Sequence, residues 1–131
     1  MNANENKQLM KNVFAELSNG NSKPFGEILD DDVRWTIIGT TKWSKTYDGK
    51  QSVYEDLLEP LFARFANQYK GVAKRIIAED DYVVVEAHGN SKTNAGEDYN
   101  NEYCYIFRFD DGKVSEITEY CDTALIERTL G

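Results

Sequence analysis

Residues 101–123 constrain the fold of this chain more than any other stretch, because they read as two β-strands joined by a tight turn. Both arms are rich in Tyr, Phe, Ile and Thr, which suit a pleated, half-buried surface. Two turns are possible: a two-residue Asp-Gly loop that pairs Asp110 with Lys113, or a type I turn with a left-handed bulge at Gly112 that pairs Phe109 with Lys113. The choice matters because a slip of one residue moves every side chain to the other face.

The bulge is the preferred interpretation, because it separates the side chains into one mostly apolar face and one mixed face. It places Tyr103 opposite Glu119. The apolar face then carries Tyr103, Tyr105, Phe107, Ile117, Glu119 and Cys121, and the mixed face carries Glu102, Cys104, Ile106, Arg108, Glu116, Thr118, Tyr120 and Asp122. Because Cys104 and Cys121 point to opposite sides, no disulfide is expected.

The rest of the chain places helices first and strands afterwards. Apolar residues at helical spacing predict a helix over about 4–19 and a second over about 52–65, with Ser52 and Glu55 as a capping box and Pro60 as a kink or break. Short helical turns are expected after Pro24 and in the tail. Strands are expected at about 33–38, 71–79, 82–93, 99–109 and 113–122, and a loop at about 39–48.

This order of elements is typical of an α+β fold. We expect a single domain over residues 1–131, with N-terminal helices packed on a strongly curved mixed or antiparallel sheet. Such a sheet would form a cone-shaped half-barrel with an internal pocket.

Composition argues against several functional classes. A net charge of −8 without a basic stripe predicts no binding to nucleic acid or to an anionic membrane. No apolar run approaches the roughly 18 residues of a membrane span, and the N-terminus lacks the basic and apolar blocks of a signal peptide, so a cytoplasmic location is expected. Two cysteines and one histidine form no recognisable zinc set, and neither metal nor cofactor is expected.

Several segments also resemble a known family in their order and spacing. They are Asp31-Asp32-Val33-Arg34-Trp35, Tyr47-Asp48-Gly49, Val83-Val84-Val85-Glu86 with Gly89, Tyr99-Asn100-Asn101-Glu102-Tyr103, Phe107-Arg108-Phe109-Asp110-Asp111-Gly112-Lys113 and Glu119-Tyr120-Cys121-Asp122-Thr123. Over nearly its whole length the chain resembles the SnoaL-like polyketide cyclase group of the nuclear transport factor 2-like superfamily. The resemblance implies a cone with a pocket between sheet and helices, commonly in a homodimer.

The same superfamily holds scytalone dehydratase, ketosteroid isomerase and limonene epoxide hydrolase, and the last two offer positions to compare. Ketosteroid isomerases carry their general-base Asp where this chain has Trp35, and their oxyanion-hole Tyr and Asp where it has Phe14 and Tyr105. The Asp-Arg-Asp set of limonene epoxide hydrolases matches Glu119 at one acid and falls near Ala87 and Gly89 at the other two positions. Neither mechanism is therefore expected to transfer unchanged.

Glu119 is the leading catalytic candidate. A carboxyl surrounded by Trp and Tyr should resist ionisation, so its pKa should rise from about 4.3 toward the range useful for proton transfer at neutral pH. Tyr103 and Tyr105 could donate hydrogen bonds to a substrate carbonyl or a developing enolate. The alternative is a solvated Glu119 at the pocket mouth, bonded to Tyr103, with both tyrosines as core residues.

The other candidates are residues expected to line the pocket or its surroundings. The ligand-binding candidates are Phe14, Trp35, Ile37, Phe62, Phe65, Val85, Ala87, Asn101, Phe107, Ile117 and Cys121. Asn101 has a strand-end cap as its alternative role. His88 is expected on the outer or dimer face and Asp122 as a helix cap, while Trp43 reads equally as a lid or a dimer contact.

The predicted function is that of a small-molecule pocket protein. The leading hypothesis is a cofactor-independent acid/base enzyme of the isomerase, cyclase, dehydratase or hydrolase type, acting on an apolar, oxygen-bearing molecule. The alternatives are a non-catalytic ligand-binding module and a dimeric interaction module whose pocket is filled by its own side chains. A homodimer is expected through the mixed face of the sheet, which presents Ile106, Arg108, Thr118 and Tyr120.

Overall fold

Six strands form one mixed sheet in the spatial order β2-β1-β6-β5-β4-β3. In the computed structural model, which describes residues 1–131, the strands are β1 (Leu29–Ile37), β2 (Thr46–Asp48), β3 (Lys70–Glu79), β4 (Tyr82–Asn90), β5 (Glu102–Asp110) and β6 (Lys113–Cys121). Neighbouring strands are antiparallel except β1 and β6, which run parallel. The α+β class is confirmed, whereas β2 lies where the sequence pattern predicted a loop.

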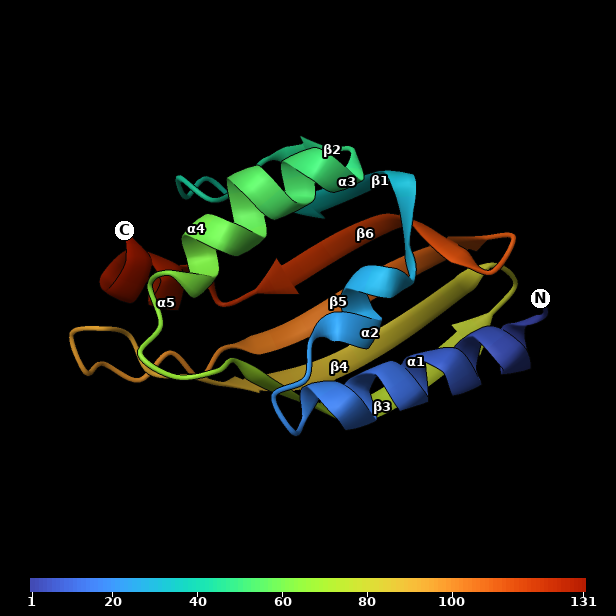
Figure 1. Cartoon of the computed structure of the whole chain (residues 1–131), viewed down its shortest axis with the longest axis horizontal. Helices are drawn as coiled ribbons and strands as arrows, with labels where there is room; N and C mark the ends of the chain where they lie inside the picture. Colours follow the sequence, from blue (N-terminus) through green and yellow to red (C-terminus); the bar gives the residue numbers. More distant parts are fainter.

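The helices lie over one face of this sheet (Figure 1). They are α1 (Ala3–Leu17), α2 (Lys23–Glu27), the continuous run of α3 (Lys50–Ser52), η1 (Val53–Leu58) and α4 (Glu59–Phe62), and α5 (Thr123–Leu130) at the end of β6. The sheet is not strongly curled, so the predicted cone is wrong in that respect. The helices standing over the sheet, rather than its curvature, enclose the interior.

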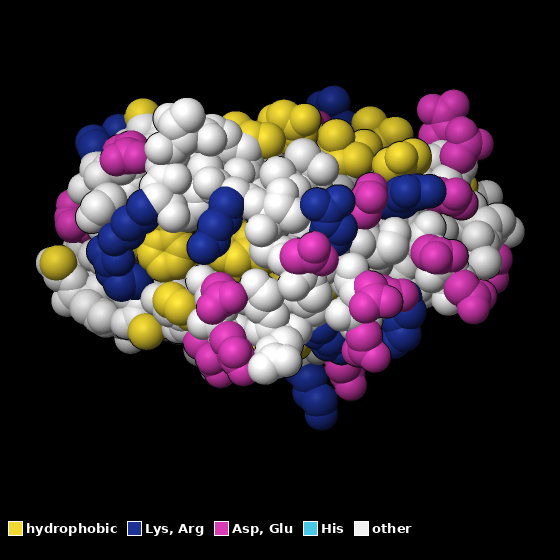
Figure 2. Space-filling view, turned by 90° about the horizontal axis from the view of Figure 1, so that it is seen from above, with side chains coloured by type: hydrophobic (Ala, Val, Ile, Leu, Met, Phe, Trp, Pro, Cys, Tyr) yellow, Lys and Arg dark blue, Asp and Glu magenta, His cyan; other side chains and the backbone are white.

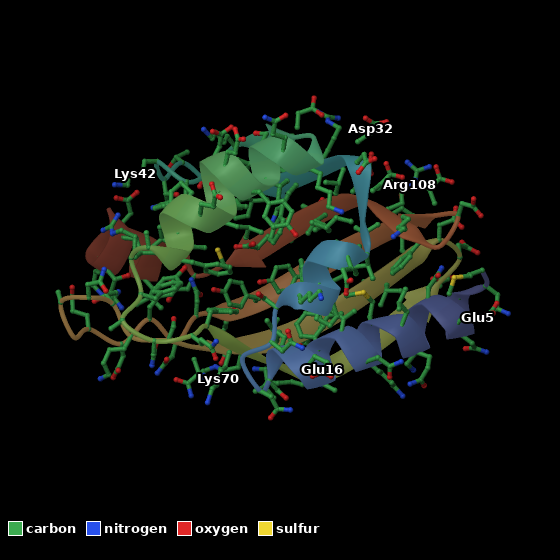
Figure 3. All side chains as sticks on the ribbon, in the orientation of Figure 1. Glu5, Glu16, Asp32, Lys42, Lys70 and Arg108 are labelled. Carbon is green, nitrogen blue, oxygen red and sulfur yellow. The ribbon has the colours of Figure 1, made fainter.

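Helix α1 follows the predicted pattern. The Asn2 side chain accepts a hydrogen bond from the Glu5 backbone and the Glu5 side chain accepts one from the Asn2 backbone, which makes a complete capping box. Its apolar stripe, including Met10, Val13 and Leu17, is buried, while charged side chains such as Glu5 and Glu16 point outward (Figure 3).

No helix of the chain is both long enough and apolar enough to cross a bilayer.

The second long helix changes type along its length. It begins at Lys50, so the predicted capping box at Ser52 is wrong; the Ser52 hydroxyl bonds the Asp56 carboxylate instead. Pro60 has no N–H to donate in the α pattern. Residues 53–58 adopt the wider π-helix, and the Glu59 N–H donates to the Tyr54 carbonyl. The break predicted at Pro60 is therefore a local change of helical winding.

The hairpin between β5 and β6 has the two-residue turn, so the preferred bulge at Gly112 is wrong. Asp111 and Gly112 both have positive φ, at 51° and 79°, and Asp110 pairs with Lys113. A bulge does occur, but at Ser115: Phe109 pairs with Val114, and the next pair is Arg108 with Glu116. Beyond it Tyr105 lies opposite Glu119 and Tyr103 opposite Cys121, two residues away from the predicted pairing.

The bulge at Ser115 preserves the predicted faces despite the different turn. Odd-numbered residues of β4, β5 and the second half of β6 point toward the helices, and the core contains Val83, Val85, Phe107 and Ile117. His88 lies on the outer face beside Glu102, and Cys104 and Cys121 are free thiols. The Asp122 carboxylate accepts hydrogen bonds from the first backbone N–H groups of α5, which confirms the predicted helix cap.

Candidate functional site

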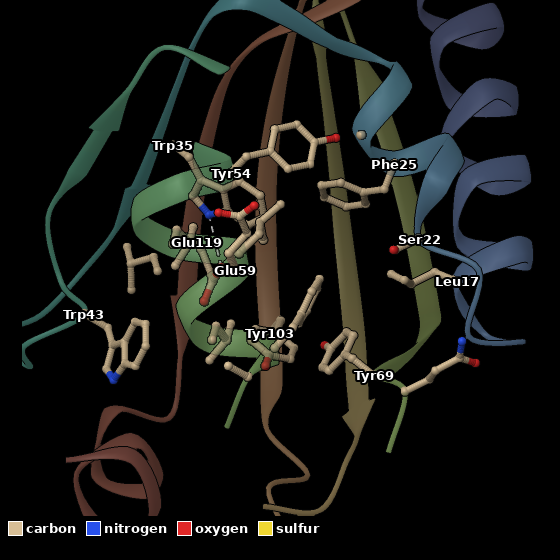
Figure 4. Close-up of a pocket in the computed structure, with 18 of the residues that line it drawn as sticks. Leu17, Ser22, Phe25, Trp35, Trp43, Tyr54, Glu59, Tyr69, Tyr103 and Glu119 are labelled. Atoms are coloured by element: carbon tan, nitrogen blue, oxygen red, sulfur yellow. Dashed lines mark hydrogen bonds between the residues drawn. The ribbon is translucent and has the colours of Figure 1, made fainter. Parts of the chain in front are cut away.

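A cavity of about 800 Å³ lies between the inner face of the sheet and the helices. Hydrophobic residues make up 17 of the 27 that line it. Figure 4 shows Glu119, Trp35 and Tyr103 on one side of this space and Leu17, Phe25 and Tyr69 toward α1 and α2. From above, hydrophobic side chains are exposed between lysine and arginine side chains on part of the surface (Figure 2). The interior is therefore open, and side chains of the chain itself do not fill it.

Glu119 projects into this cavity from β6, and the Trp35 indole anchors its carboxyl. The parallel pairing of β1 with β6 sets Trp35 beside Ile117 and Ile37 beside Glu119. This register lets the Trp35 indole Nε1–H donate to Glu119 Oε1 at 3.1 Å. Glu119 is only 7% exposed. No nitrogen or oxygen of the chain bonds the second carboxylate oxygen, Oε2. The indole thus holds Oε1, while no N–H or O–H donor holds Oε2.

Burial raises the pKa of Glu119 from 4.5 to about 7, although the hydrogen bonds from Trp35 and Cys121 oppose that rise. The ionised carboxylate loses its hydration in the aromatic surroundings, and two donors restore only part of it. A carboxyl with this pKa can both accept and release a proton near neutral pH.

Tyrosines surround the Glu119 carboxyl. Tyr105 is its cross-strand partner, and the ring of Tyr103 stacks on that of Tyr105 with centroids 5.1 Å apart. Tyr69 and Tyr99 line the same region. Burial raises the pKa of all four phenols above the usual value of 10, with further contributions from one another and from Glu119. They therefore stay protonated and can donate hydrogen bonds at neutral pH.

The structure brings six of the predicted site residues to the cavity and leaves the others elsewhere. Glu119, Tyr103, Tyr105, Trp35, Ile37 and Phe62 line it. Phe65 lines a neighbouring hollow instead. Phe14, Val85, Ala87, Phe107 and Ile117 pack in the core, and Cys121 is partly buried beside Glu119. For the strand residues among them the correct face was predicted, but α1, which carries Phe14, and neighbouring side chains cover them.

Asn101 is a structural residue and does not line the cavity. Its side chain is fully buried; the amide donates to the Tyr99 hydroxyl at 3.0 Å and to the Asp122 carbonyl at 3.2 Å. The Asp122 backbone N–H donates to Asn101 Oδ1 at 3.0 Å in return. Its hydrogen bonds tie the start of β5 to the end of β6, so the strand-end role holds and the ligand-binding role is wrong.

Several lining residues were missed by sequence reasoning. Helical spacing identified Leu57, Leu58 and Leu61 as apolar but did not show that they face a cavity. The other large apolar or aromatic residues that were missed are Leu17, Phe25, Trp43, Tyr54, Tyr69, Tyr99, Ile126 and Leu130. Trp43 is buried in the wall, where its indole N–H donates to the Leu130 carbonyl at 3.2 Å. This contact places Trp43 against α5 rather than in a free lid.

Tyr54 lies at the mouth of the cavity and reaches across to α2 (Figure 4). Its side chain is on the π-helical segment and the residue is 37% exposed. The hydroxyl occupies the place where a Cβ at position 26 would lie, so only Gly26 admits the ring in this position. The contact closes part of the gap between α2 and η1.

Charged side chains of both signs stand at the rim, among them Lys23, Glu27, Lys50 and Glu59. Lys50 Nζ donates to the Leu29 carbonyl at 3.4 Å. No three His, Cys, Asp or Glu side chains lie close enough together to hold a metal ion.

Solved structures of similar fold define the class of this protein. The fold is that of nuclear transport factor 2-like proteins. A candidate SnoaL-like polyketide cyclase from Jannaschia sp. CCS1 is 17% identical, with a TM-score of 0.79 over 97% of this chain and 92% of that one. A candidate isomerase from Bacillus subtilis is 18% identical, with a TM-score of 0.80 over 100% and 96%. TerC, co-crystallised with polyporic acid, is 16% identical, with a TM-score of 0.79 over 95% and 97%.

The family follows from the sequence itself. The model of the SnoaL-like domain matches residues 10–117, so the chain belongs to the SnoaL-like domain family. No curated protein matches the chain in sequence. Proteins named as cyclases and isomerases share this fold, and the particular activity must be argued from the site.

The raised pKa of Glu119 makes stability depend on pH. The folded state holds this proton more tightly than the unfolded chain, so the proton's stabilising effect is complete below about pH 4.5 and is lost as pH rises through about 7. We expect E119Q to gain roughly 3 kcal/mol relative to wild type between these pH values. Urea unfolding of both proteins across the range measures the difference, and a constant difference would contradict the assignment.

Trp35→Phe provides the matched control for that pKa. Removing the indole donor leaves the carboxylate less stabilised, so the pKa of Glu119 should rise further. NMR titration of the side-chain carboxyl carbon reports it directly. A lower pKa in W35F would show that the indole does not stabilise the ionised form.

The contact between Tyr54 and Gly26 can be tested by a double-mutant cycle. G26A should cost about 1–3 kcal/mol of unfolding free energy, because the new methyl group displaces the Tyr54 hydroxyl. In a Y54A background the same change should be neutral or stabilising, since Ala suits a helix better than Gly. Equal costs in the two backgrounds would mean that the hydroxyl is not packed on Gly26.

Proposed function

We propose that this protein is a cofactor-independent acid/base enzyme that acts on an apolar, oxygen-bearing small molecule. The observation that carries the proposal is Glu119, a carboxyl with a pKa of about 7 in a largely apolar cavity. The Trp35 indole anchors its Oε1, and no N–H or O–H donor bonds its Oε2. Sites with strongly perturbed carboxyl groups in clefts are frequent locations of catalysis. The cavity volume also suits a drug-sized molecule.

Proton abstraction next to a carbonyl is the step that this geometry supports best. Glu119 Oε2 takes a proton from the carbon, the C–H electron pair forms a carbon–carbon double bond, and the carbonyl π pair moves to oxygen. Neutral Tyr103 and Tyr105 hydroxyls donate to the resulting enolate oxygen. Protonated Glu119 then returns the proton to the same or another carbon. Alternatively, the enolate carbon attacks a second carbonyl carbon of the same molecule, the π pair of that carbonyl moves to its oxygen, and the resulting alkoxide takes the proton from Glu119.

These two outcomes correspond to isomerisation and cyclisation. Dehydration follows if the enolate expels a hydroxyl group that takes the Glu119 proton, and hydrolysis follows if Glu119 activates water instead. TerC, which shares the fold, was co-crystallised with polyporic acid, and this supports a small organic molecule as the ligand. A non-catalytic binding module remains the second candidate, because the cavity offers no second buried carboxyl beside Glu119.

The reaction can be tested without knowing the natural substrate. Wild-type protein should speed deuterium exchange at the α-carbons of 2-tetralone, an apolar bicyclic ketone, in D₂O followed by proton NMR. E119Q should lower the protein-dependent rate by at least about hundredfold. Binding of 2-tetralone to E119Q should stay within about threefold of wild type.

Y103F and Y105F complete this series, and each should slow exchange because an enolate donor is lost. Exchange at the same rate in E119Q and wild type would end the catalytic proposal. Binding without exchange above the buffer rate would favour the non-catalytic module.

The outer face of the sheet supports a further proposal, that of a homodimer. By their strand registers, four exposed apolar or aromatic side chains share this face: Val72, Ile77, Tyr82 and Tyr120. Covering these separate side chains with a second copy of the chain would remove their apolar surface from water. Sedimentation at micromolar concentration should show a dimer for wild type and a monomer for Y120E, with binding of 2-tetralone unchanged. A wild-type monomer would contradict this proposal.

A further inference from the structure

A second hollow, of about 540 Å³, adjoins the main cavity, and the proposed reaction does not use it. Five residues line both spaces: Gly20, Ser22, Phe62, Gln68 and Tyr69. They come from the loop between α1 and α2, from α4 and from the segment before β3. Because these side chains form the common wall, we call this hollow the side chamber.

The wall of the side chamber is held in place by the loop that follows β4. The Ala66 N–H donates to the Lys92 carbonyl at 2.8 Å, and the Asn94 backbone N–H donates to the Arg64 carbonyl at 2.9 Å. The Asn94 side-chain amide donates to the Ala63 carbonyl at 2.8 Å. These bonds fix the segment between α4 and β3 before any ligand enters, which lowers the ordering cost of binding.

Aromatic rings and unused polar groups meet in this chamber. The rings of Phe62, Phe65 and Tyr69 lie with centroids 6.1–6.4 Å apart, and Phe62 is 38% exposed. The Ser22 hydroxyl does not cap α2, and the Gln68 amide has no hydrogen-bond partner in the chain. Hydroxyl and amide groups both donate and accept hydrogen bonds.

None of the eight residues that line the side chamber is charged. An ionic substituent would therefore meet no opposite charge among them. Ser22 and Gln68 are exposed to solvent, so a purely apolar substituent would displace the water that solvates them without replacing its hydrogen bonds. A neutral ring with several hydroxyl groups satisfies both conditions, because its faces pack on the aromatic rings and its hydroxyls pair with the polar groups.

We propose that the side chamber binds a neutral, hydroxylated ring, such as a glycosyl group, carried by a ligand whose apolar, oxygen-bearing part occupies the main cavity. The inference rests on the proposed ligand-binding role of the main cavity but not on catalysis. It names the substrate class as a two-part molecule, with an apolar end at Glu119 and a neutral polyol end at Gln68.

Calorimetric binding of three probes tests the proposal: 2-naphthol, 2-naphthyl β-D-glucopyranoside and 2-hexyloxynaphthalene. Wild type should bind the glucoside at least about tenfold more tightly than 2-naphthol, as expected for two or more added hydrogen bonds. The S22A/Q68A double variant should lose that gain and bind 2-naphthol as wild type does. Q8A, which changes an exposed glutamine on α1, is the matched control and should bind all three probes as wild type does.

The outcomes separate the two proposals. If 2-naphthol binds but the glucoside binds no more tightly, the side-chamber proposal is wrong while the main cavity stands. If 2-hexyloxynaphthalene binds as tightly as the glucoside, the chamber is a general apolar space and the proposal is also overturned. If none of the probes binds, both the side chamber and the ligand-binding role of the main cavity are overturned.

Discussion

The bulge at Ser115 determines which side chains of the hairpin face the helices. Between the turn and the bulge Val114 faces inward, and after the extra residue Ile117 and Glu119 do so. Without that residue the pleat would carry Thr118 and Tyr120 inward and leave Glu119 in solvent. The carboxyl therefore reaches the interior because one unpaired residue corrects the register that the two-residue turn imposes. Bulges beside functional sites are a recurrent feature of sheets, and this one sets which side chains of β6 reach the candidate site.

Bringing a carboxyl into this interior is unfavourable, and the neighbouring groups reduce that cost only in part. The Trp35 indole offers a single neutral hydrogen bond to Glu119 Oε1, and the surrounding tyrosines remain neutral. No lysine or arginine forms an ion pair with it. An arginine there would have stabilised the ionised form and returned the pKa toward its usual value. The site thus keeps a carboxyl that changes protonation near neutral pH, which a purely structural ion pair would not provide.

The sequence predicted the fold class and the inward face but not the limits of the cavity. Alternation along β5 and β6 identified Tyr103, Tyr105 and Glu119 because period 2 is a local property. Val85 and Phe107 share that face of the sheet, yet they pack in the core beneath α1, where Phe14 of α1 contacts Phe107, and their exclusion from the cavity depends on where the helices sit. Tyr54 belongs to the apolar pattern of the second helix, but spacing did not show that it reaches across to α2, and Tyr69, which just precedes a strand, gave no periodic signal. Helix placement is a long-range property that spacing does not encode.

The two relatives compared at the sequence level place their catalytic acids on different strands, and this structure relates those positions. The position that matches the general base of ketosteroid isomerases is Trp35 on β1, and the position that matches an acid of limonene epoxide hydrolases is Glu119 on β6. Because β1 and β6 are parallel neighbours, the two side chains meet in a 3.1 Å hydrogen bond. Side chains from either strand can therefore reach the region around this carboxyl. In this chain β6 carries the carboxyl and β1 carries the indole that donates to it, so neither group's residue set is reproduced at the two matched positions.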